Sequence, residues 1–286
     1  MANLRIIRQR IRSVQSTQKI TRAMQMVAGS KLRRMQEELV AFRPYARQLR
    51  AMTERFLLSH PDLTHPLLDR ESREAPAPIG LLLISSDTGL CGTYNERIFE
   101  IAQNFLKENP SAVVAAIGKK GTRTLSRKGK RSLKEITDWG GRFGLSKAMA
   151  LYQWMEELYL KGTVSGWWVA YTQFISAMRF SPTIERFLPT PAPEQIEGPG
   201  PERVIVEPEA AVTADAMLRR FLKSQLSRVL LEAFTSEHSA RMMSMRNATD
   251  NAAEMIEHLT LSRNKARQAA ITKELIEVVS GSEALK

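Results

Sequence analysis

The residues best suited to chemistry lie in a glycine-containing loop that follows a short apolar stretch. The stretch Ile79 to Ser85 has the pattern of a buried strand, and the loop Ser86 to Gly92, with the sequence SDTGLCG, comes next. A strand, a glycine loop and a helix form the nucleotide-binding crevice of many α/β proteins. The glycine spacing here fits neither GxGxxG nor GxxxxGKS/T, and Gly118 to Thr122 (GKKGT) lacks the phosphate-loop spacing too. The sequence therefore predicts no phosphate-binding loop.

Other reactive side chains also lack partners at a useful spacing. The single cysteine, Cys91, stands beside glycines at a predicted helix start, where its pKa could be lowered, but a lone cysteine in a tight turn is more often structural. The acid pair Glu156 and Glu157 falls on an amphipathic helix, where we expect solvated carboxylates. Four histidines show neither metal-ligand spacing nor a nucleophile partner: His60, His65, His238 and His258. We therefore expect a non-catalytic chain with no cofactor and no metal site.

The middle of the chain has the pattern of a Rossmann-like α/β domain. Helical patterns cover 94–108 and 145–160, and a short basic helix or turn is predicted at 119–128. Further strands are predicted at 112–117, 132–137 and 164–174, with a strand or turn at 184–188 and an irregular proline-rich segment at 189–208. Strands that alternate with helices imply a mostly parallel sheet.

Both ends of the chain are predicted to be long helices. The run from Glu209 to Ser280 contains neither proline nor glycine, and as one helix it would be about 108 Å long. A helix of that length needs a partner helix. The other end supplies a heptad seam: Leu4, Ile7, Ile11, Val14, Gln18, Thr21, Gln25, Ala28, Leu32, Met35, Leu39, Phe42, Ala46, Leu49, Thr53 and Phe56. We therefore predict an antiparallel coiled coil of the two terminal helices, with the α/β domain inserted between them.

Irregularities in both helices lead to further expectations. Pro44 should end or kink the first helix near Phe42. The seam becomes polar around Thr21, and apolar residues move instead to Ile20, Met24 and Val27, so this section should meet a different surface. The apolar stripe of the second helix shifts by one residue along its length, from Leu222, Leu226, Val229, Ala233 and Ala240 to Ala248, Ala252, Met255, Leu259, Ala266 and Ala269. This drift favours a loosely wound pair.

Composition sets the domain boundaries at 1–58, 59–208 and 209–286. Twelve of the 13 prolines and thirteen of the 15 glycines fall between Pro61 and Pro208. One cysteine allows no intrachain disulfide, which fits a reducing compartment. We find no signal-peptide pattern and no apolar run of membrane-spanning length.

The net charge of +12 is concentrated in the first helix. Residues 1–58 carry thirteen Lys or Arg against three Glu, and the first acidic residue of the chain is Glu37. Such a helix suggests an acidic partner, namely nucleic acid, an anionic membrane or a carboxylate-rich protein surface. A solvated polar face explains the composition equally well.

Three stretches together give the chain a resemblance to a known family. The first is 11–28, IRSVQSTQKITRAMQMVA, followed by Ser30-Lys31 and Arg43-Pro44-Tyr45. The second is Ser86-Asp87 through Gly92, with Asn95 shortly after. The third comprises Ser236-Glu237, Ala240-Arg241-Met242, Ala248-Thr249-Asp250-Asn251, Asn264-Lys265-Ala266-Arg267-Gln268 and Ile271-Thr272 to Gly281. In order, spacing and placement these stretches resemble the gamma subunit of the F-type ATP synthases.

The resemblance implies a rotor rather than an enzyme. The paired terminal helices of that family form a shaft inside a ring of three alpha and three beta subunits, and the catalytic sites lie on beta. The shaft couples ion flow through a membrane ring of c subunits to ATP synthesis or hydrolysis. The middle domain would lie outside the alpha–beta ring with the epsilon subunit and the c ring. The implied location is the cytoplasmic face of the bacterial inner membrane, as a peripheral subunit with no membrane insertion and no nucleic acid partner.

The resemblance also assigns beta-subunit contacts. Met24, with Arg22 near it, matches the neck region that faces an acidic lever of beta. Gln268 and Thr272 match positions that hydrogen-bond a loop of beta.

Two further sets of residues follow from the resemblance. The apolar end of the second helix would turn in a bearing at the far end of the ring, through Ile271, Leu275, Val278 and Val279. Glu207 matches an acidic position that meets loops of the c subunits.

Some positions depart from the family pattern, and two other functions stay open from the residues alone. Thr88, Thr93-Tyr94 and Trp167-Trp168 are unusual, which suggests an atypical bacterial version whose middle domain meets variant partners. One alternative function is a coiled-coil nucleic-acid-binding protein with residues 1–36 as its basic arm. The other is an α/β nucleotide enzyme with helical arms, which would require the missing phosphate loop.

Overall fold

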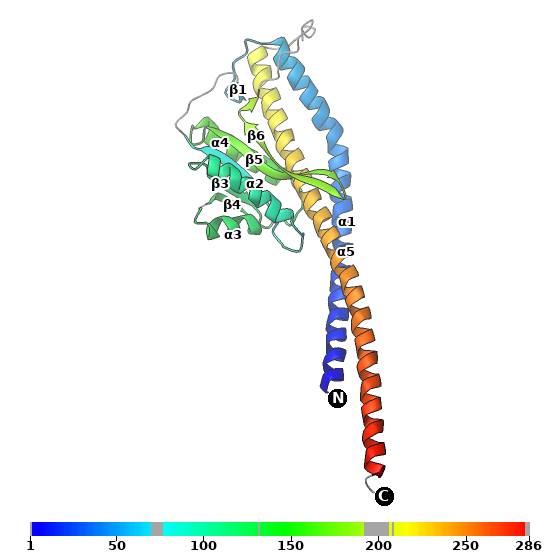
Figure 1. The fold of residues 1–286 in the computed structure, drawn as a ribbon. Coiled ribbons are helices and arrows are strands. Elements are labelled where there is room, and N and C mark those ends of the chain that lie inside the picture. Colours follow the sequence, from blue (N-terminus) through cyan, green and yellow to red (C-terminus); the bar gives the residue numbers. More distant parts are fainter. Residues whose placement is uncertain (1, 70–76, 131, 192–205, 208, 284–286) are drawn as a thin grey trace. The chain divides into compact units, whose positions relative to one another are not determined.

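The computed structural model describes residues 2–69, 77–130, 132–191, 206–207 and 209–283 (Figure 1). It separates into two compact units, one made of Met1–Ala28 with Arg241–Lys286 and the other of Gly29–Ala240. We call the first the shaft unit and the second the domain unit. Two long helices, α1 (Ala2–Ser59) and α5 (Ala210–Glu283), contribute residues to both units.

The predicted seam of α1 is confirmed. Every seam residue from Leu4 to Phe56 is buried or half-buried, and Leu39 and Phe56 are almost completely inaccessible. The residues of α1 that lie between the seam positions are mostly polar and exposed. The heptad spacing in the sequence is therefore the spacing of the buried stripe, as expected for a helix that packs along a partner.

Of the two outcomes expected for Pro44, an end or a kink of α1 near Phe42, the end is wrong, because the helix runs through Pro44 to Ser59. Proline lacks the N–H that would bond to the carbonyl of Val40, four residues earlier. Both Pro44 and Val40 are exposed, so this carbonyl lies on the water-facing side of the helix. Water can satisfy it there, and the helix continues.

In the shaft unit the polar part of the seam remains in the helix pair. Gln18, Thr21 and Gln25 are half-buried, and Thr249 Oγ1 of α5 donates a hydrogen bond to Thr21 Oγ1 at 2.8 Å. Thr21 Oγ1 in turn donates to the carbonyl of Gln18 at 3.1 Å. Of the apolar residues that leave the seam here, Ile20 and Val27 are exposed and Met24 is half-buried. The seam thus stays continuous, and two of the three displaced apolar side chains face outward.

The predicted stripe of α5 needs correction beyond Ala252. Met255 was expected to face α1, but it is 53% exposed and Ile256 is half-buried in its place. Ala269 is also exposed. The other predicted positions hold, because Ala248, Leu259 and Ala266 are half-buried. The less exposed positions alternate regularly by three and four residues, so the register does not drift further along this part of the helix: Thr249, Ala252, Ile256, Leu259, Arg263, Ala266 and Ala270.

The domain unit contains a five-stranded sheet in the order β4-β3-β2-β5-β6. Its strands are β2 (Ile79–Ile84), β3 (Val113–Ile117), β4 (Ser132–Ile136), β5 (Gly166–Ser176) and β6 (Arg179–Leu188). The first four are parallel, and β6 is antiparallel to β5. The connecting helices are α2 (Tyr94–Glu108), α3 (Lys119–Arg127) and α4 (Leu145–Leu160). The predicted mostly parallel α/β domain is confirmed.

Alternate side chains of β2 face the two layers of helices that cover the sheet. Leu81 and Leu83 pack with Ile98 and Ala102 of α2 and with Leu125 of α3. The opposite side chains of the same strand, Leu82 and Ile84, join a larger core with α4, α1 and α5. The domain unit is therefore a helix–sheet–helix sandwich whose inner strands are buried on both faces, which explains their continuous apolar sequence.

The strand after β5 is longer than predicted. It begins at Arg179 rather than near Ile184, and it includes Pro182, which pairs opposite Thr172. Proline is tolerated there because β6 is an edge strand. The segment 189–208, predicted as irregular, contains a short strand β7 (Thr190–Pro191) that pairs with β1 (Leu68–Asp69), and 192–205 and 208 lie outside the described residues.

Helix α5 carries a polar stretch into the core of the domain unit. Thr235, Ser236, Glu237, His238 and Ser239 are all buried. His238 Nε2 lies 2.8 Å from the carbonyl oxygen of Gly141, and Ser239 Oγ donates to the carbonyl of Ala177. This part of the helix is enclosed on all sides, which an amphipathic pattern cannot reveal.

Candidate functional site

The glycine-containing loop after β2 is a structural junction. The carboxylate of Asp87 accepts backbone N–H groups from Lys119 and Asp138 at 3.2 Å each and from Gly140 at 2.8 Å. Lys119 is the first residue of α3, and a helix N-terminus is where a phosphate would bind in a nucleotide-binding domain. The chain's own carboxylate takes this place and ties the ends of β2, β3 and β4 together.

The crevice beside the loop is filled by protein. In this strand order the switch point lies between β2 and β5, where open α/β sheets bind ligands. Tyr94, at the start of α2, donates its hydroxyl to the carbonyl of Ala233 of α5 at 3.1 Å. Cys91 and Tyr94 pack with Ala240 and Phe180 in one apolar cluster. Helix α5 therefore closes the carboxyl end of β2, where a nucleotide would enter.

Cys91 is 2% exposed, and Asn95 Nδ2 donates to its sulfur at 3.2 Å. Asn95 also accepts the backbone N–H of Ser86 at 3.1 Å. These contacts agree with the structural interpretation of the lone cysteine. They also show what the polar residues of the loop do, because Ser86 and Asn95 hold the loop to the first turn of α2.

The expectation for the acid pair on α4 is half wrong. Glu157 is exposed and pairs with Lys161 at 2.6 Å. Glu156, in contrast, is buried, where it accepts the Tyr152 hydroxyl at 2.9 Å and forms an ion pair with Arg219 of α5. Burial and the neighbouring carboxylate raise the pKa of Tyr152 well above its usual value. The sequence missed this contact because the compensating arginine lies far away in the chain.

Three of the histidines, His60, His65 and His238, have separate structural contacts, and His258 is exposed. His65 Nε2 lies 3.2 Å from Asp215, whose pKa is lowered mainly by the hydrogen bond from Arg219. In the part of the chain that the structure describes, no three His, Cys, Asp or Glu side chains gather in a way that could hold a metal ion. No described helix combines the length and hydrophobicity that crossing a bilayer requires.

The shaft unit, by contrast, exposes apolar side chains. On α1, Ile20 is 58%, Met26 64% and Val27 58% exposed, and the predicted contact residues Met24 and Arg22 are half-buried and exposed beside them. We call these five residues the neck patch; Ile20, Met24 and Val27 lie on one face of α1, and Arg22 and Met26 lie on another. Clustered exposed apolar residues are typical of protein contact sites rather than of a solvated face.

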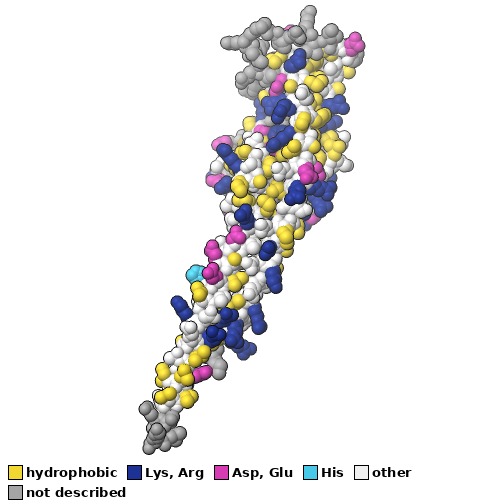
Figure 2. Space-filling view, turned by 90° about the vertical axis from the view of Figure 1, so that its right-hand side faces the viewer, with side chains coloured by type: hydrophobic (Ala, Val, Ile, Leu, Met, Phe, Trp, Pro, Cys, Tyr) yellow, Lys and Arg dark blue, Asp and Glu magenta, His cyan; other side chains and the backbone are white. Residues whose placement is uncertain are grey.

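A second exposed surface covers the end of α5. Thr21 lies level with Thr249 in the antiparallel pair, so the start of α1 lies level with about residue 268 and the rest of α5 extends past it. From Ile271 to Ser280 every residue of α5 is exposed. Figure 2 shows hydrophobic side chains gathered near this end of the helix. The exposed apolar set, which we call the tip, is Ile271, Leu275, Ile276, Val278 and Val279.

The structure places the expected contact residues in separate regions. Gln268 and Thr272 are exposed one turn apart on α5, and Thr272 Oγ1 donates to the carbonyl of Gln268 at 3.0 Å. Because Met24 lies level with about residue 246, Gln268 and Thr272 are about 33 Å and about 39 Å from it along the helix axis. Glu207 is exposed just before α5, in the other unit. Sequence reasoning missed Met26 and Ile276, whose only signal is an apolar residue off the seam.

Known proteins resemble this chain over its whole length. The family model described as ATP synthase matches residues 3–285. The ATP synthase gamma chain of Moorella thermoacetica is 43% identical over 289 residues, and that of Heliobacterium modesticaldum is 40% identical over 295 residues; each alignment covers 100% of both chains.

Solved structures share the fold. A chain of the Euglena gracilis mitochondrial ATP synthase rotor matches with a TM-score of 0.68 at 16% identity, over 94% of this chain and 99% of that one. A chain of the Tetrahymena thermophila mitochondrial ATP synthase central stalk and c-ring matches with a TM-score of 0.60 at 24% identity, over 80% of this chain and 99% of that one. With a family match over nearly every residue and full-length relatives at 40–43% identity, the chain belongs to the family of ATP synthase gamma chains.

Proposed function

We propose that this gamma chain is the rotating central shaft that couples ion flow through a c ring to ATP synthesis or hydrolysis on the beta subunits of an alpha3–beta3 ring. The observation that carries the proposal is the tip, an apolar helix end that is exposed along ten consecutive residues. Exposed apolar surface of this extent marks a contact site. If this end of the shaft turns in a bearing formed by other subunits, those subunits cover the exposed apolar surface.

The individual contacts follow from the same proposal. The neck patch would meet an acidic segment of beta through Arg22 and Met24, and Gln268 and Thr272 would hydrogen-bond a second beta segment. Residues 1–58 and 209–286 would form the shaft, and the domain 59–208, with Glu207, would meet the epsilon subunit and the c ring. The solved relatives come from assemblies described as central stalk with c-ring and as F1 with c-ring, which supports these partners.

The proposed location is the cytoplasmic face of a bacterial inner membrane, as a peripheral part of the complex. It is supported by the bacterial origin of the relatives at about 40% identity. Rotation would carry the asymmetric shaft past each beta subunit in turn, so that distinct contacts favour distinct nucleotide affinities.

The sequence suggests an atypical version of the subunit whose unusual residues meet variant partners, and two of those residues do not fit this role. Tyr94 and Trp167 depart from the family pattern, but both are buried, and Trp167 Nε1 donates to the carbonyl of Met155 at 2.9 Å. These two side chains belong to the packing of the domain unit and cannot touch a partner directly. A variant partner surface would have to involve exposed positions such as Thr88.

An assembly experiment tests the proposed function. The cognate alpha and beta subunits are mixed with and without the full chain, and complex mass and ATP hydrolysis are measured. We expect one copy to enter an alpha3–beta3 ring and to raise its turnover. Absence of association at moderate salt, together with DNA binding that weakens steeply with salt, would overturn the proposal in favour of a basic coiled-coil nucleic-acid-binding protein.

A further inference from the structure

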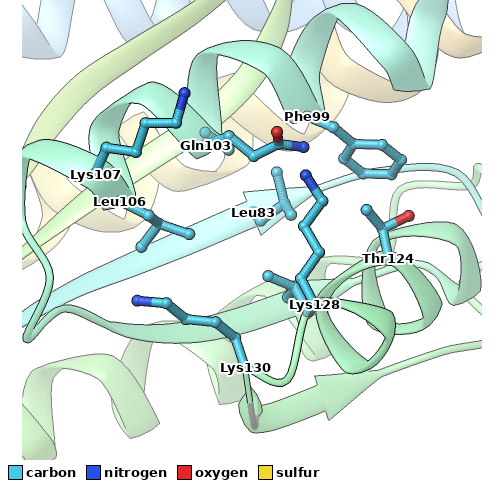
Figure 3. A pocket seen from close by; sticks show the side chains of 10 residues that line it. Leu83, Phe99, Gln103, Leu106, Lys107, Thr124, Lys128 and Lys130 are labelled. Atoms are coloured by element: carbon cyan, nitrogen blue, oxygen red, sulfur yellow. The ribbon is translucent and has the colours of Figure 1, made fainter.

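A pocket opens on the outer face of the domain unit, between α2 and α3 (Figure 3). Its volume is about 220 Å³. It lies on the side of the sheet that is covered by α2 and α3, whereas α4 and α5 pack on the other side. The proposed shaft contacts do not use any of its residues.

The floor and walls of the pocket are apolar. Leu83 of β2, Ala102 of α2 and Leu125 of α3 are buried at its base, and Phe99 and Leu106 of α2 form its sides. The volume exceeds the ~150 Å³ of an engineered apolar cavity that binds benzene, and it falls below the ~300 Å³ at which drug-sized sites begin. The pocket therefore suits a single ring or a short alkyl chain and is too small for a nucleotide.

The rim of the pocket is positively charged. Lys107, Lys128 and Lys130 line it, and none of its ten lining residues is acidic. In Figure 3, Lys128 extends from the end of α3 across the mouth toward Gln103 and Phe99. Lys130 is held at the opposite side, where its Nζ donates to the carbonyl of Pro110 at 3.2 Å. Within the described part of the chain, neither Lys107 nor Lys128 forms an ion pair.

We propose that this pocket binds a small amphipathic anion. The apolar body lies on Leu83, Phe99 and Leu125, and its carboxylate or phosphate head lies at the mouth beside Lys128. The apolar floor and the lysines at the mouth carry the assignment together. An apolar floor alone would accept a neutral ligand, and a lysine cluster alone would accept any anion. A lysine ammonium offers three donors to either head group.

Calorimetric titration of the full chain with octanoate tests the site. Octyl phosphate has the same tail with a phosphate head, and octanol and octylammonium have the same tail without a negative charge. We expect saturable binding of at least one of the two anions, with their relative affinity identifying the head group. We expect markedly weaker binding of octanol and none of octylammonium. Equal binding of octanol and both anions would overturn the assignment of an anion site.

Variants locate the binding. Lys128→Gln should weaken the anion about two- to fivefold, the range that an exposed charge pair supplies. Lys161→Gln is the control, since Lys161 is an exposed lysine directly after α4 and does not line the pocket, and it should leave the affinity unchanged. Thr124→Phe should abolish saturation by filling the mouth, and Gln103→Phe serves the same purpose from α2 if circular dichroism shows that the first variant is misfolded. Wild-type affinity in both Lys128→Gln and a folded mouth variant would overturn the proposal, and it would leave the shaft function untouched.

Discussion

At the residue scale, Asp87 occupies the place that a phosphate takes in a nucleotide-binding domain, and its role there is structural. Its carboxylate bonds three backbone N–H groups in two different connections after β3 and β4. Hydrogen bonds to an ionised acceptor are stronger than neutral ones, and each N–H left without a partner would cost its desolvation. One side chain thus fixes three loops and occupies the position where an anion would bind.

Asp87→Asn should therefore lower the free energy of unfolding by about 1–3 kcal/mol, because the amide offers one acceptor oxygen where the carboxylate offers two. Urea unfolding at pH 7.5 measures the change. Asp62→Asn, at an exposed position, is the matched control and should change stability by less than about 0.5 kcal/mol. Equal effects of the two variants would show that the three bonds contribute nothing specific.

A buried ion cluster in the domain unit gives a prediction about pH. Arg228 donates to Glu185 at 2.6 Å, to the Tyr171 hydroxyl at 3.1 Å and to Glu232 at 3.4 Å. Among the described residues, Glu232 Oε2 has no hydrogen-bond partner. Burial raises the pKa of Glu232 above its ordinary value, although Arg228 and Arg43 act against this rise. The folded state therefore holds the proton of Glu232 more tightly than the unfolded state does.

The raised pKa of Glu232 makes the folded state less stable, relative to the unfolded state, as the pH rises. The stability that protonated Glu232 contributes is fully present below the unfolded pKa of about 4.3, and it is lost as the pH rises through the higher folded pKa. Glu232→Gln should remove this loss, which amounts to at most about 1.4 kcal/mol per pH unit. Chemical unfolding between pH 4 and 8 should show the wild type losing stability relative to the variant as pH rises. Parallel curves, as expected for the exposed control Glu254→Gln, would contradict the prediction.

At the element scale, the helix pair of the shaft unit combines an apolar seam with one polar contact. Thr21 and Thr249 hydrogen-bond across the seam where Gln18 and Gln25 also enter it. Apolar seams tolerate sliding by a heptad, and a single buried polar pair fixes one register at some cost in stability. We therefore predict that the hydroxyl pair selects which residues of α5 extend past the start of α1, and with them the position of the tip.

A double-mutant cycle should detect this contact. Thr21→Val or Thr249→Val alone removes the hydroxyl–hydroxyl contact and leaves the other hydroxyl only its carbonyl partner within its own helix, Gln18 or Met245, whereas the double variant removes both hydroxyls. We expect a coupling free energy of about 0.5–1.5 kcal/mol from thermal or urea unfolding. Thr17→Val combined with Thr249→Val is the control cycle, because Thr17 is exposed and bonds only within α1. A coupling as small in the first cycle as in the control would rule out a register role.

At the scale of the whole molecule, stability and partner binding are assigned to different residues. Large apolar side chains such as Leu226 and Leu230 of α5 are buried in the core of the domain unit. The tip residues of the same helix, with at least half of each side chain exposed, contribute little to folding of the isolated chain. The chain should therefore fold alone and still expose an apolar surface that only an assembly covers.

Leu275→Glu with Val279→Glu tests this separation. We expect unfolding of the isolated chain to change by less than about 0.5 kcal/mol, since both side chains are exposed, while assembly with alpha and beta and the stimulation of ATP hydrolysis are lost. Val212→Glu, an equally exposed position in the domain unit, should leave both measurements unchanged. Full stimulation by the tip variant would remove the tip from the proposed bearing, whatever the fate of the neck patch.

The sequence by itself determined the elements of this protein. Local patterns predict the seam of α1, the bounds of α2 and α4, and the parallel strands. These patterns are the periodicity of apolar residues and the glycines and prolines that end an element, and both act over a few residues. The resemblance in the sequence identified the family, and it named Met24, Gln268, Thr272 and the apolar end of α5.

Tertiary structure decided what depends on partners distant in the chain. Glu156 is buried because Arg219 compensates it, and α1 passes Pro44 because the affected carbonyl faces water. The polar run from Thr235 to Ser239 is enclosed by loops from other elements, which no helical periodicity encodes. Exposure of the tip depends on where the pairing with α1 ends. Burial is a property of the assembled surfaces, so a pattern within one element cannot supply it.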